Sequence, residues 1–448
     1  MGIQDRSNSK STQVNRTGRP IYRLPEELLV YVFRIIAQHN PFGIGRLLFV
    51  SQYWYIVIRN TPSLWSRIRI APRISSDILK YTQYTMVALA NSVNHLLDVT
   101  VDLHLYTYLD ERGQKVPRMS LSALDEVQFT TLFQAVVGSD GSSMARWRSF
   151  RVRVPGKRFD VLFGPSSVFG QFMRGLRYPT PHLESLFIRL QFSDEYFTNV
   201  GGPLQELQHL KILVVDAGGH LGYLKYIPGN IEALCFRLWG STKVMSPFSN
   251  LRHLSILSIP NRSITHEDDP VIVFPLLESL TLEVQDPGRV FNPAKVLTRK
   301  INAPLLDTLC LLGENAIWAM AEPTAFRHVG ALDLLSHDKK PESILKFIDE
   351  NLSGYTTLTS LTVCPWHLED VMKALRSLKD QGRAPVDLDT IYTIISDNEG
   401  LLLDHSSVES VIILGRLASE YLYRSHLLSG DSGSDTDPFP PRMLDYPF

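Results

Sequence analysis

The segment after Pro25 carries apolar residues at the spacing of an amphipathic helix. They recur at i, i+1, i+4, i+5 and i+8 and so share one broad helical face: Leu28, Leu29, Val32, Phe33 and Ile36. Proline at the start and two glutamates behind it favour a helix N-terminus, because acids complement the helix dipole there. The sequence therefore predicts a helix from Glu26 that Asn40-Pro41-Phe42-Gly43 ends.

A second helical pattern follows directly. It runs through Leu47, Val50, Trp54 and Ile58, and Thr61-Pro62 breaks it. Taken alone, the two patterns predict a helical hairpin whose apolar faces pack against each other.

Further along, six segments share a pattern of apolar, charged, any, leucine, any, apolar. They begin at Leu183, Leu210, Ile231, Leu251, Leu277 and Leu306, and two copies without the charge begin at Val329 and Leu358. Their mean spacing is about 25 residues, within the roughly 20–29-residue period of leucine-rich repeats. Because side chains alternate along a strand, the fourth-position leucines should all point inward: Leu186, Leu213, Leu234, Leu254, Leu280 and Leu309.

Weaker signals extend this repeat in both directions. Degenerate copies begin at Trp65, Leu97 and Trp147, and residues 389–395 suit one more strand. The run 408–414 fits either a strand or a helix. Helical patterns follow two late strands, one opened by Pro341-Glu342 and one from Leu368 to a stop near Gly382.

Strands that alternate with helices predict an α/β fold, either an irregular leucine-rich-repeat solenoid or some other α/β domain. The arc should be irregular because the asparagine of the family's repeat is absent after the strands. The predicted domains are a disordered segment over 1–19, a helical module over 20–70, the solenoid over 71–425 with an insertion loop near 106–143, and a disordered acidic tail over 426–448.

The helical module resembles the F-box. The similarity lies in the string LPEELLVYVFRII, then LLFVSQYWYIVI, then TPSLW, all in the family's order. Ser51 departs from it, because many members have cysteine there, and Gln52-Tyr53 stands where a basic residue is common. The resemblance implies adaptor binding by these residues: Leu24, Pro25, Leu28, Leu29, Val32, Phe33, Leu47, Val50, Trp54, Pro62, Leu64 and Trp65.

F-box proteins connect a Skp1-type adaptor, and through it a cullin–RING ligase, to a protein substrate. The resemblance thus implies a substrate receptor of an SCF-type ubiquitin ligase, or alternatively a scaffold that does not drive turnover. Substrate would bind the concave face of the solenoid, formed by residues between the inward ones: Arg151, Arg153, Phe187, Arg189, Asp216, Arg237, His253 and Glu283. The arginines would suit an acidic or phosphorylated segment, unless they are simply the solvated alternate residues of half-buried strands.

Composition adds limits on function. The 448 residues have a formal charge of −1, without the basic surplus that nucleic-acid binders usually carry. Three cysteines without a C-x-x-C pair argue against a disulfide framework or a structural zinc site. No apolar leader or membrane-spanning stretch occurs. We therefore expect a cytoplasmic and/or nuclear protein that needs no cofactor or metal, binds neither nucleic acid nor membrane, and is not an enzyme.

Overall fold

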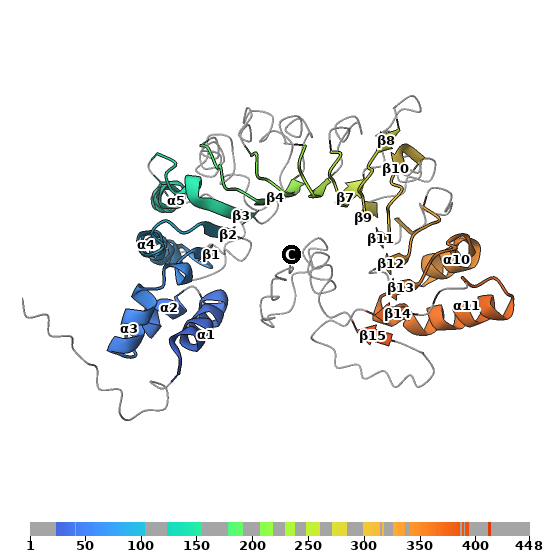
Figure 1. Cartoon of the computed structure of the whole chain (residues 1–448), viewed down its shortest axis with the longest axis horizontal. Coiled ribbons are helices and arrows are strands. Elements are labelled where there is room, and N and C mark those ends of the chain that lie inside the picture. The colour runs from blue at the N-terminus through green and yellow to red at the C-terminus, as the bar shows by residue number, and fades with distance from the viewer. Residues whose placement is uncertain are drawn as a thin grey trace, which may run out of the picture. The chain divides into compact units, whose positions relative to one another are not determined.

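The computed structural model (Figure 1) has a mixed α/β fold with a large parallel sheet. The residues that it describes are 24–40, 42–103, 123–138, 140–154, 178–190, 207–217, 229–237, 248–259, 271–284, 299–313, 316–317, 326–336, 341–385, 388, 390–393 and 411–413. They belong to two compact units, residues 1–184 and 185–448, called unit 1 and unit 2 below. The segments 1–19 and 426–448, for which disorder is predicted, lie outside the described residues.

Unit 1 begins with short helices. Helix α1 (Glu26–His39) occupies the predicted place, and α2 (Gly43–Leu47), α3 (Gln52–Arg59) and the 3-10 turn η2 (Pro62–Leu64) follow it. The prediction of one continuous second helix is wrong, because the chain is extended at Ser51, with φ −163° and ψ 158°. The Ser51 hydroxyl accepts a hydrogen bond from the Trp54 N–H at 3.1 Å, so Ser51 caps a new helix.

Three parallel strands pair in chain order in the rest of unit 1. They are β1 (Arg67–Ile70), β2 (Leu97–Asp102) and β3 (Trp147–Val154), which confirms the three degenerate copies as strands. Helix α4 (Ser75–Asn91) connects β1 to β2, and α5 (Ala123–Val137) and the turn η3 (Met144–Arg146) precede β3.

The prediction of a loop over 106–143 is wrong where α5 lies. This helix buries an apolar face at helical spacing: Phe129, Leu132, Phe133 and Val136. The Gly- and Ser-bearing residues on either side of this stretch obscured its periodicity. Residues 104–122 of the predicted loop lie outside the described part of the chain.

Unit 2 contributes ten described strands, again parallel and paired in chain order. They are β4 (Ser185–Leu190), β5 (Ile212–Ala217), β6 (Ala233–Arg237), β7 (His253–Ile259), β9 (Ser279–Val284), β11 (Thr308–Leu312), β12 (Ala331–Leu335), β13 (Ser360–Val363), β14 (Thr390–Thr393) and β15 (Val411–Ile413). The strands β8 (Ile272–Val273) and β10 (Ile301–Asn302) form a separate parallel pair. All eight predicted repeat copies of this region are therefore strands, and the open choice at 408–414 is decided for a strand.

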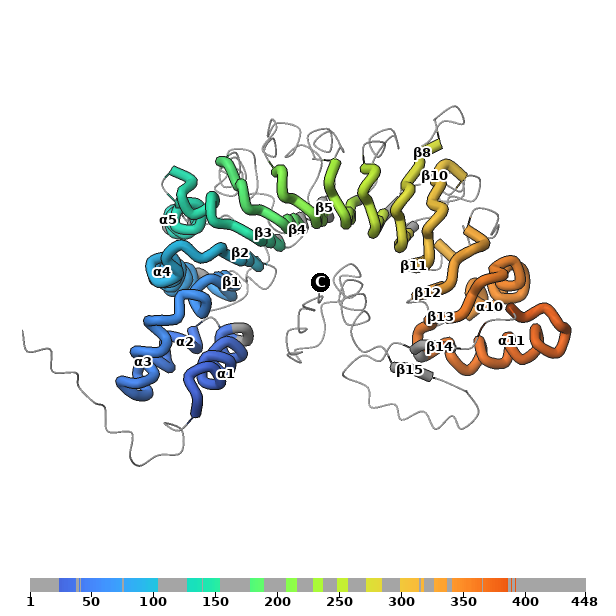
Figure 2. Tube along the Cα trace, viewed as in Figure 1, coloured from blue at the N-terminus to red at the C-terminus, as the bar shows by residue number. Residues whose placement is uncertain are grey.

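The predicted leucine register is confirmed. Leu186, Leu213, Leu234, Leu254, Leu280 and Leu309 are direct partners across successive strands, and all six are buried. Figure 2 shows the strands of unit 2 side by side in chain order. The residues between these leucines form the other side of the sheet, which we call the alternate face.

Two helices of unit 2 also lie where the sequence predicts them. Helix α10 (Glu342–Asn351) starts after Pro341, and α11 (Leu368–Asp380) ends before Gly382, whose φ of +68° suits glycine. The turns η8 (Leu352–Gly354) and η9 (Pro365–His367) frame β13. Figure 1 shows both helices on one side of β12 and β13.

The charged second position of the repeat forms a row along one end of the strands. In unit 2 its signs alternate through Lys211, Glu232, Arg252 and Glu278, and each residue donates its backbone N–H to the carbonyl of the previous one at 2.8 Å. Arg252 and Glu278 form an ion pair. Opposite charges on neighbouring strands contribute roughly 0.2–1 kcal/mol per pair, so this row favours the observed register.

Candidate protein-interaction surface

Helix α1 has two apolar faces, and only one of them is packed. On the packed face, Leu29 and Phe33 are buried. The Phe33 ring meets the Trp54 indole of α3 edge-on, with ring centroids 4.9 Å apart. Such aromatic pairs contribute about 0.5–1.5 kcal/mol beyond their burial. These contacts hold the helical module together.

The other face of α1 is uncovered. Leu28 is 53% exposed and Tyr31 is 59% exposed, and Leu24, Val32 and Ile35 are exposed too. Spacings of four, seven or eight, and eleven residues place all five on one side of the helix axis. An apolar stripe in this position gains nothing from the fold of the chain itself.

Further apolar side chains of the same module are exposed. Phe49, at 89%, and Val50 lie in the turn before α3, and Tyr55 and Ile56 lie on α3 itself. Together with the α1 stripe they make up what we call the exposed apolar set: Leu24, Leu28, Tyr31, Val32, Ile35, Phe49, Val50, Tyr55 and Ile56. Large exposed apolar surfaces of this kind mark binding sites on soluble proteins.

The predicted adaptor-binding residues divide into three groups by burial. Those at the surface are Leu24, Pro25, Leu28, Val32 and Val50, and those half-buried are Leu47 and Pro62. The buried ones are Leu29, Phe33, Trp54, Leu64 and Trp65. The Trp65 indole N–H donates to the Ile58 carbonyl at 3.1 Å, for example, and so closes the module internally. Sequence reasoning missed Tyr31, Ile35, Phe49, Tyr55 and Ile56, which no quoted motif position marks.

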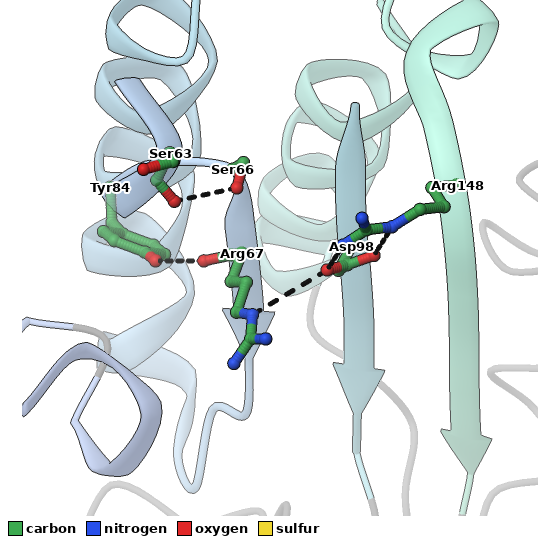
Figure 3. Close-up of polar contacts among 6 residues, drawn as sticks. All are labelled: Ser63, Ser66, Arg67, Tyr84, Asp98 and Arg148. Carbon is green, nitrogen blue, oxygen red and sulfur yellow. Dashed lines mark hydrogen bonds and ion pairs between the residues drawn. The ribbon is translucent and has the colours of Figure 1, made fainter. Parts of the chain in front are cut away.

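The helical module is firmly attached to the first strand of unit 1. The Phe42 ring packs against Tyr81 and Tyr84 of α4, with centroids 4.9 and 5.6 Å away. Tyr84 donates its hydroxyl to the Arg67 carbonyl at 3.1 Å (Figure 3), and burial raises the pKa of that phenol. Arg59 at the end of α3 donates to the Asn91 side chain at 2.8 Å.

An ion-pair network ties the three strands of unit 1 together (Figure 3). Arg148 donates to both carboxylate oxygens of Asp98, at 3.0 and 2.5 Å, and Arg67 lies 3.8 Å from the same carboxylate. The hydrogen bonds to Asp98 raise the pKa of Arg148. The network connects β1, β2 and β3, so the module and these strands share one polar framework.

The predicted concave-face residues lie on the alternate face, but the structure does not bring them into one described site. Arg151 and Arg153 belong to unit 1, and the other six belong to unit 2. Arg151, Arg153, Phe187 and Glu283 are half-buried and His253 is exposed. The side chains of Arg189, Asp216 and Arg237 lie outside the described residues, although the backbones of Arg189 and Asp216 are cross-strand partners.

At the other end of unit 2, the alternate face carries a row of small polar side chains. Thr281, Cys310, Asp333 and Thr362 are partners across β9, β11, β12 and β13. Burial raises the pKa of Cys310 well above its ordinary value and that of Cys364 to about 12. Both thiols therefore stay protonated at neutral pH and are poor nucleophiles. The three cysteines are free.

Other kinds of site find little support in the described part of the chain. There, no group of three or more His, Cys, Asp or Glu side chains could hold a metal ion. None of the helices described combines the length and apolar character that a membrane crossing requires. No protein-family model matches this chain, and no curated protein proved similar to it.

Proposed function

We propose that this chain is the substrate-recognition subunit of an SCF-type ubiquitin ligase. Its F-box, residues 20–70, binds a Skp1-type adaptor and thereby a cullin–RING ligase. The region 71–425, an irregular leucine-rich-repeat solenoid, binds the protein to be modified. The chain itself is not an enzyme in this proposal, and it acts in the cytoplasm and/or nucleus, where cullin–RING ligases work.

The observation that carries the proposal is the exposed apolar set. It coincides with the segment that resembles the F-box, and five surface residues of the resemblance lie in or beside it: Leu24, Pro25, Leu28, Val32 and Val50. Covering a side chain the size of leucine contributes about 1.5–3 kcal/mol. A partner that covers most of this set therefore gains enough free energy for a stable complex.

The repeat region suits target binding for a different reason. Its strands follow one another in register while the spacing between copies varies. In a solenoid each repeat contacts its neighbours, so loops and surface residues can diverge without loss of the core. The alternate face then offers an extended surface that a protein segment can line.

The proposed mechanism is proximity. A target held by the repeat region and a conjugating enzyme held by the ligase are parts of one complex. The effective concentration of target lysines near the activated ubiquitin is thereby raised without a chemical contribution from this chain.

The direct test compares two matched double substitutions. Leu28→Lys with Ile35→Lys places charges on the exposed stripe of α1. Leu79→Lys with Met86→Lys does the same at the same spacing on α4, where both residues are also exposed. Binding to a purified Skp1-type adaptor is measured by calorimetry, with thermal unfolding as the check on folding.

We expect the α1 pair to abolish adaptor binding and the α4 pair to retain it, because desolvating two lysines against an apolar partner is costly. Equal binding by both variants and the wild type overturns the F-box assignment, and so does equal loss in both variants when both are folded.

A second measurement separates a receptor from a scaffold. The chain is deleted in its host cells and replaced by wild type or by the α1 variant, and protein abundances are compared. Proteins that associate with the chain and accumulate with the α1 variant identify a receptor. Association without accumulation identifies a scaffold and overturns the turnover part of the proposal.

A further inference from the structure

The row of polar side chains at the C-terminal end of unit 2 has one ionisable carboxyl at its centre. Cys310 and Thr362 are the direct cross-strand partners of Asp333, on β11 and β13. The Thr362 hydroxyl donates a hydrogen bond to the Asp333 carboxyl. A third polar group, the Thr281 hydroxyl, is hydrogen-bonded to Cys310. Asp333 is thus flanked by groups that orient its carboxyl without neutralising it.

Asp333 has an electrostatic deficit. Its side chain is half-buried on the alternate face, and desolvation by burial raises the pKa of its carboxyl. Among the described residues, no basic side chain is close enough to act on that carboxyl. A partly buried carboxylate without a cation is unfavourable, and an incoming positive charge would favour its ionised form.

The surroundings of this carboxyl are apolar. Leu312 and Leu335 face each other across β11 and β12, one step beyond Cys310 and Asp333 on the same face. Cys364 packs with them in one cluster, and the half-buried Trp366 lies against it. The indole of Trp366 is held in place because its N–H donates to His367 Nε2 at 2.9 Å. A fixed ring and two leucines therefore flank the acid.

A carboxylate beside an apolar floor fits a ligand with a matching division. Arginine and lysine have a positive head on an aliphatic stem, and such stems pack well on apolar surfaces. A phosphorylated or acidic group would meet like charge at Asp333. A purely aliphatic side chain would leave the carboxyl buried without a partner.

We propose that Asp333, with Thr362, Leu312, Leu335 and Trp366, binds one arginine or lysine side chain of the target protein. This inference rests on the proposed function, because it assigns a ligand class to the target-binding face. It also differs in sign from the basic face that the sequence predicts at Arg151, Arg153, Arg189 and Arg237. We call these five residues the Asp333 site.

The test uses the full chain bound to its adaptor and a displayed library of short peptides. The central position of each sub-library is arginine, lysine, leucine or glutamate, and the flanking positions are random. Enrichment is compared for the wild type, Asp333→Asn, Asp333→Lys and the control Glu369→Gln. The control removes one negative charge from exposed α11 instead of the alternate face.

We expect the wild type and the control to enrich arginine or lysine over leucine by at least roughly tenfold, since a partly desolvated charge pair is strongly coupled. Asp333→Asn should lose that preference and Asp333→Lys should turn it toward glutamate. The near-isosteric asparagine variant still decides the result where the lysine variant does not fold.

Three outcomes would overturn the Asp333 site. They are a wild type without a preference, a preference for glutamate, and a basic preference that persists in folded Asp333→Asn. Adaptor binding is measured on the same samples and depends on the exposed apolar set. A failed peptide preference with intact adaptor binding therefore rejects the Asp333 site alone, whereas lost adaptor binding rejects the proposed function.

Discussion

Helices α1 and α11 are of similar length, but they use their apolar residues in opposite ways. On α11 the apolar side chains Leu368, Val371, Leu375 and Leu378 are buried, and its surface carries ion pairs such as Lys373 with Glu369 at 2.7 Å. On α1, Leu29 and Phe33 are buried, while Leu28 and its exposed neighbours form a second apolar face.

This difference separates residues that serve the fold from residues that need a partner. A helix that only covers a core needs one apolar stripe and a polar outer face, as α11 has. The second stripe of α1 adds no internal packing and lowers solubility, so its presence calls for an explanation outside the chain. We attribute it to the adaptor proposed above.

The largest expected effect breaks the packed side of α1. Phe33→Ala removes a fully buried ring and its contact with Trp54, and such changes cost about 3–5 kcal/mol. Chemical denaturation should show this loss, while the neighbouring exposed Val32→Ala should change the free energy of unfolding by less than about 0.5 kcal/mol. Similar losses in both variants would contradict the two-faced reading of α1.

On the strands, the same contrast applies between buried and surface positions. Leu280→Ala should destabilise unit 2 by about 2–5 kcal/mol, because the leucine is fully buried between Leu254 and Leu309. Glu278→Ala removes only a partly exposed ion pair with Arg252, for which about 0–1 kcal/mol is typical. Urea unfolding of the two variants measures the difference, and equal losses would refute the register.

The uncovered side of α1 should affect binding instead of stability. Leu24→Ala with Pro25→Ala truncates two exposed positions at its start, and adaptor co-purification should be abolished. Each lost apolar contact lowers the affinity by about 1–2 kcal/mol in such interfaces. Circular dichroism should show an intact repeat region, and unchanged co-purification would argue against adaptor binding at this face.

A smaller effect is expected at the break between α2 and α3. Ser51→Ala removes the hydroxyl that accepts from the Trp54 N–H, and loss of a helix N-cap costs about 0.5–2 kcal/mol. Ser51→Asn keeps a capping oxygen and should restore stability. Thermal unfolding distinguishes the two, and indifference to both changes would mean that the cap does not hold α3.

The smallest effect concerns pH. Because the pKa of Asp333 is raised in the folded state above its ordinary value of 3.8, the folded chain binds this proton more tightly than the unfolded chain. Stability should therefore fall as pH rises from 3.8 through the folded pKa. Asp333→Asn should lack this part of the decline, which denaturation at several pH values would show. A steeper decline in the variant would reverse the sign.

Much of the fold was predictable because local patterns agree with it. The repeat of leucine at the fourth position locates the strands from Ser185 onward, since alternation along a strand leaves one register that buries every leucine. Helices α10 and α11 have clear starts at Pro341 and Leu368. In contrast, α4 carries Leu79 and Met86 on its exposed side, so its periodicity did not stand out.

The candidate site was predictable only in part. Motif positions identified the helical module, but they could not separate Leu28, at the surface, from Leu29, in the core, because both are leucines in one apolar run. Phe49 and Ile35 match no motif position and were missed. The carboxyl of Asp333 gave no signal either, because its neighbours Cys310 and Thr362 are distant along the chain.

By itself, the sequence determined which segments become strands and helices and which leucines point inward, because those depend on periodicity within a few residues. Only the tertiary structure decided which apolar face of α1 is packed and why charges recur at the second repeat position. It alone also decided which polar side chains surround Asp333. These properties arise from contacts between segments far apart in the chain, such as Phe33 with Trp54 and Arg252 with Glu278, and no local pattern encodes such pairings.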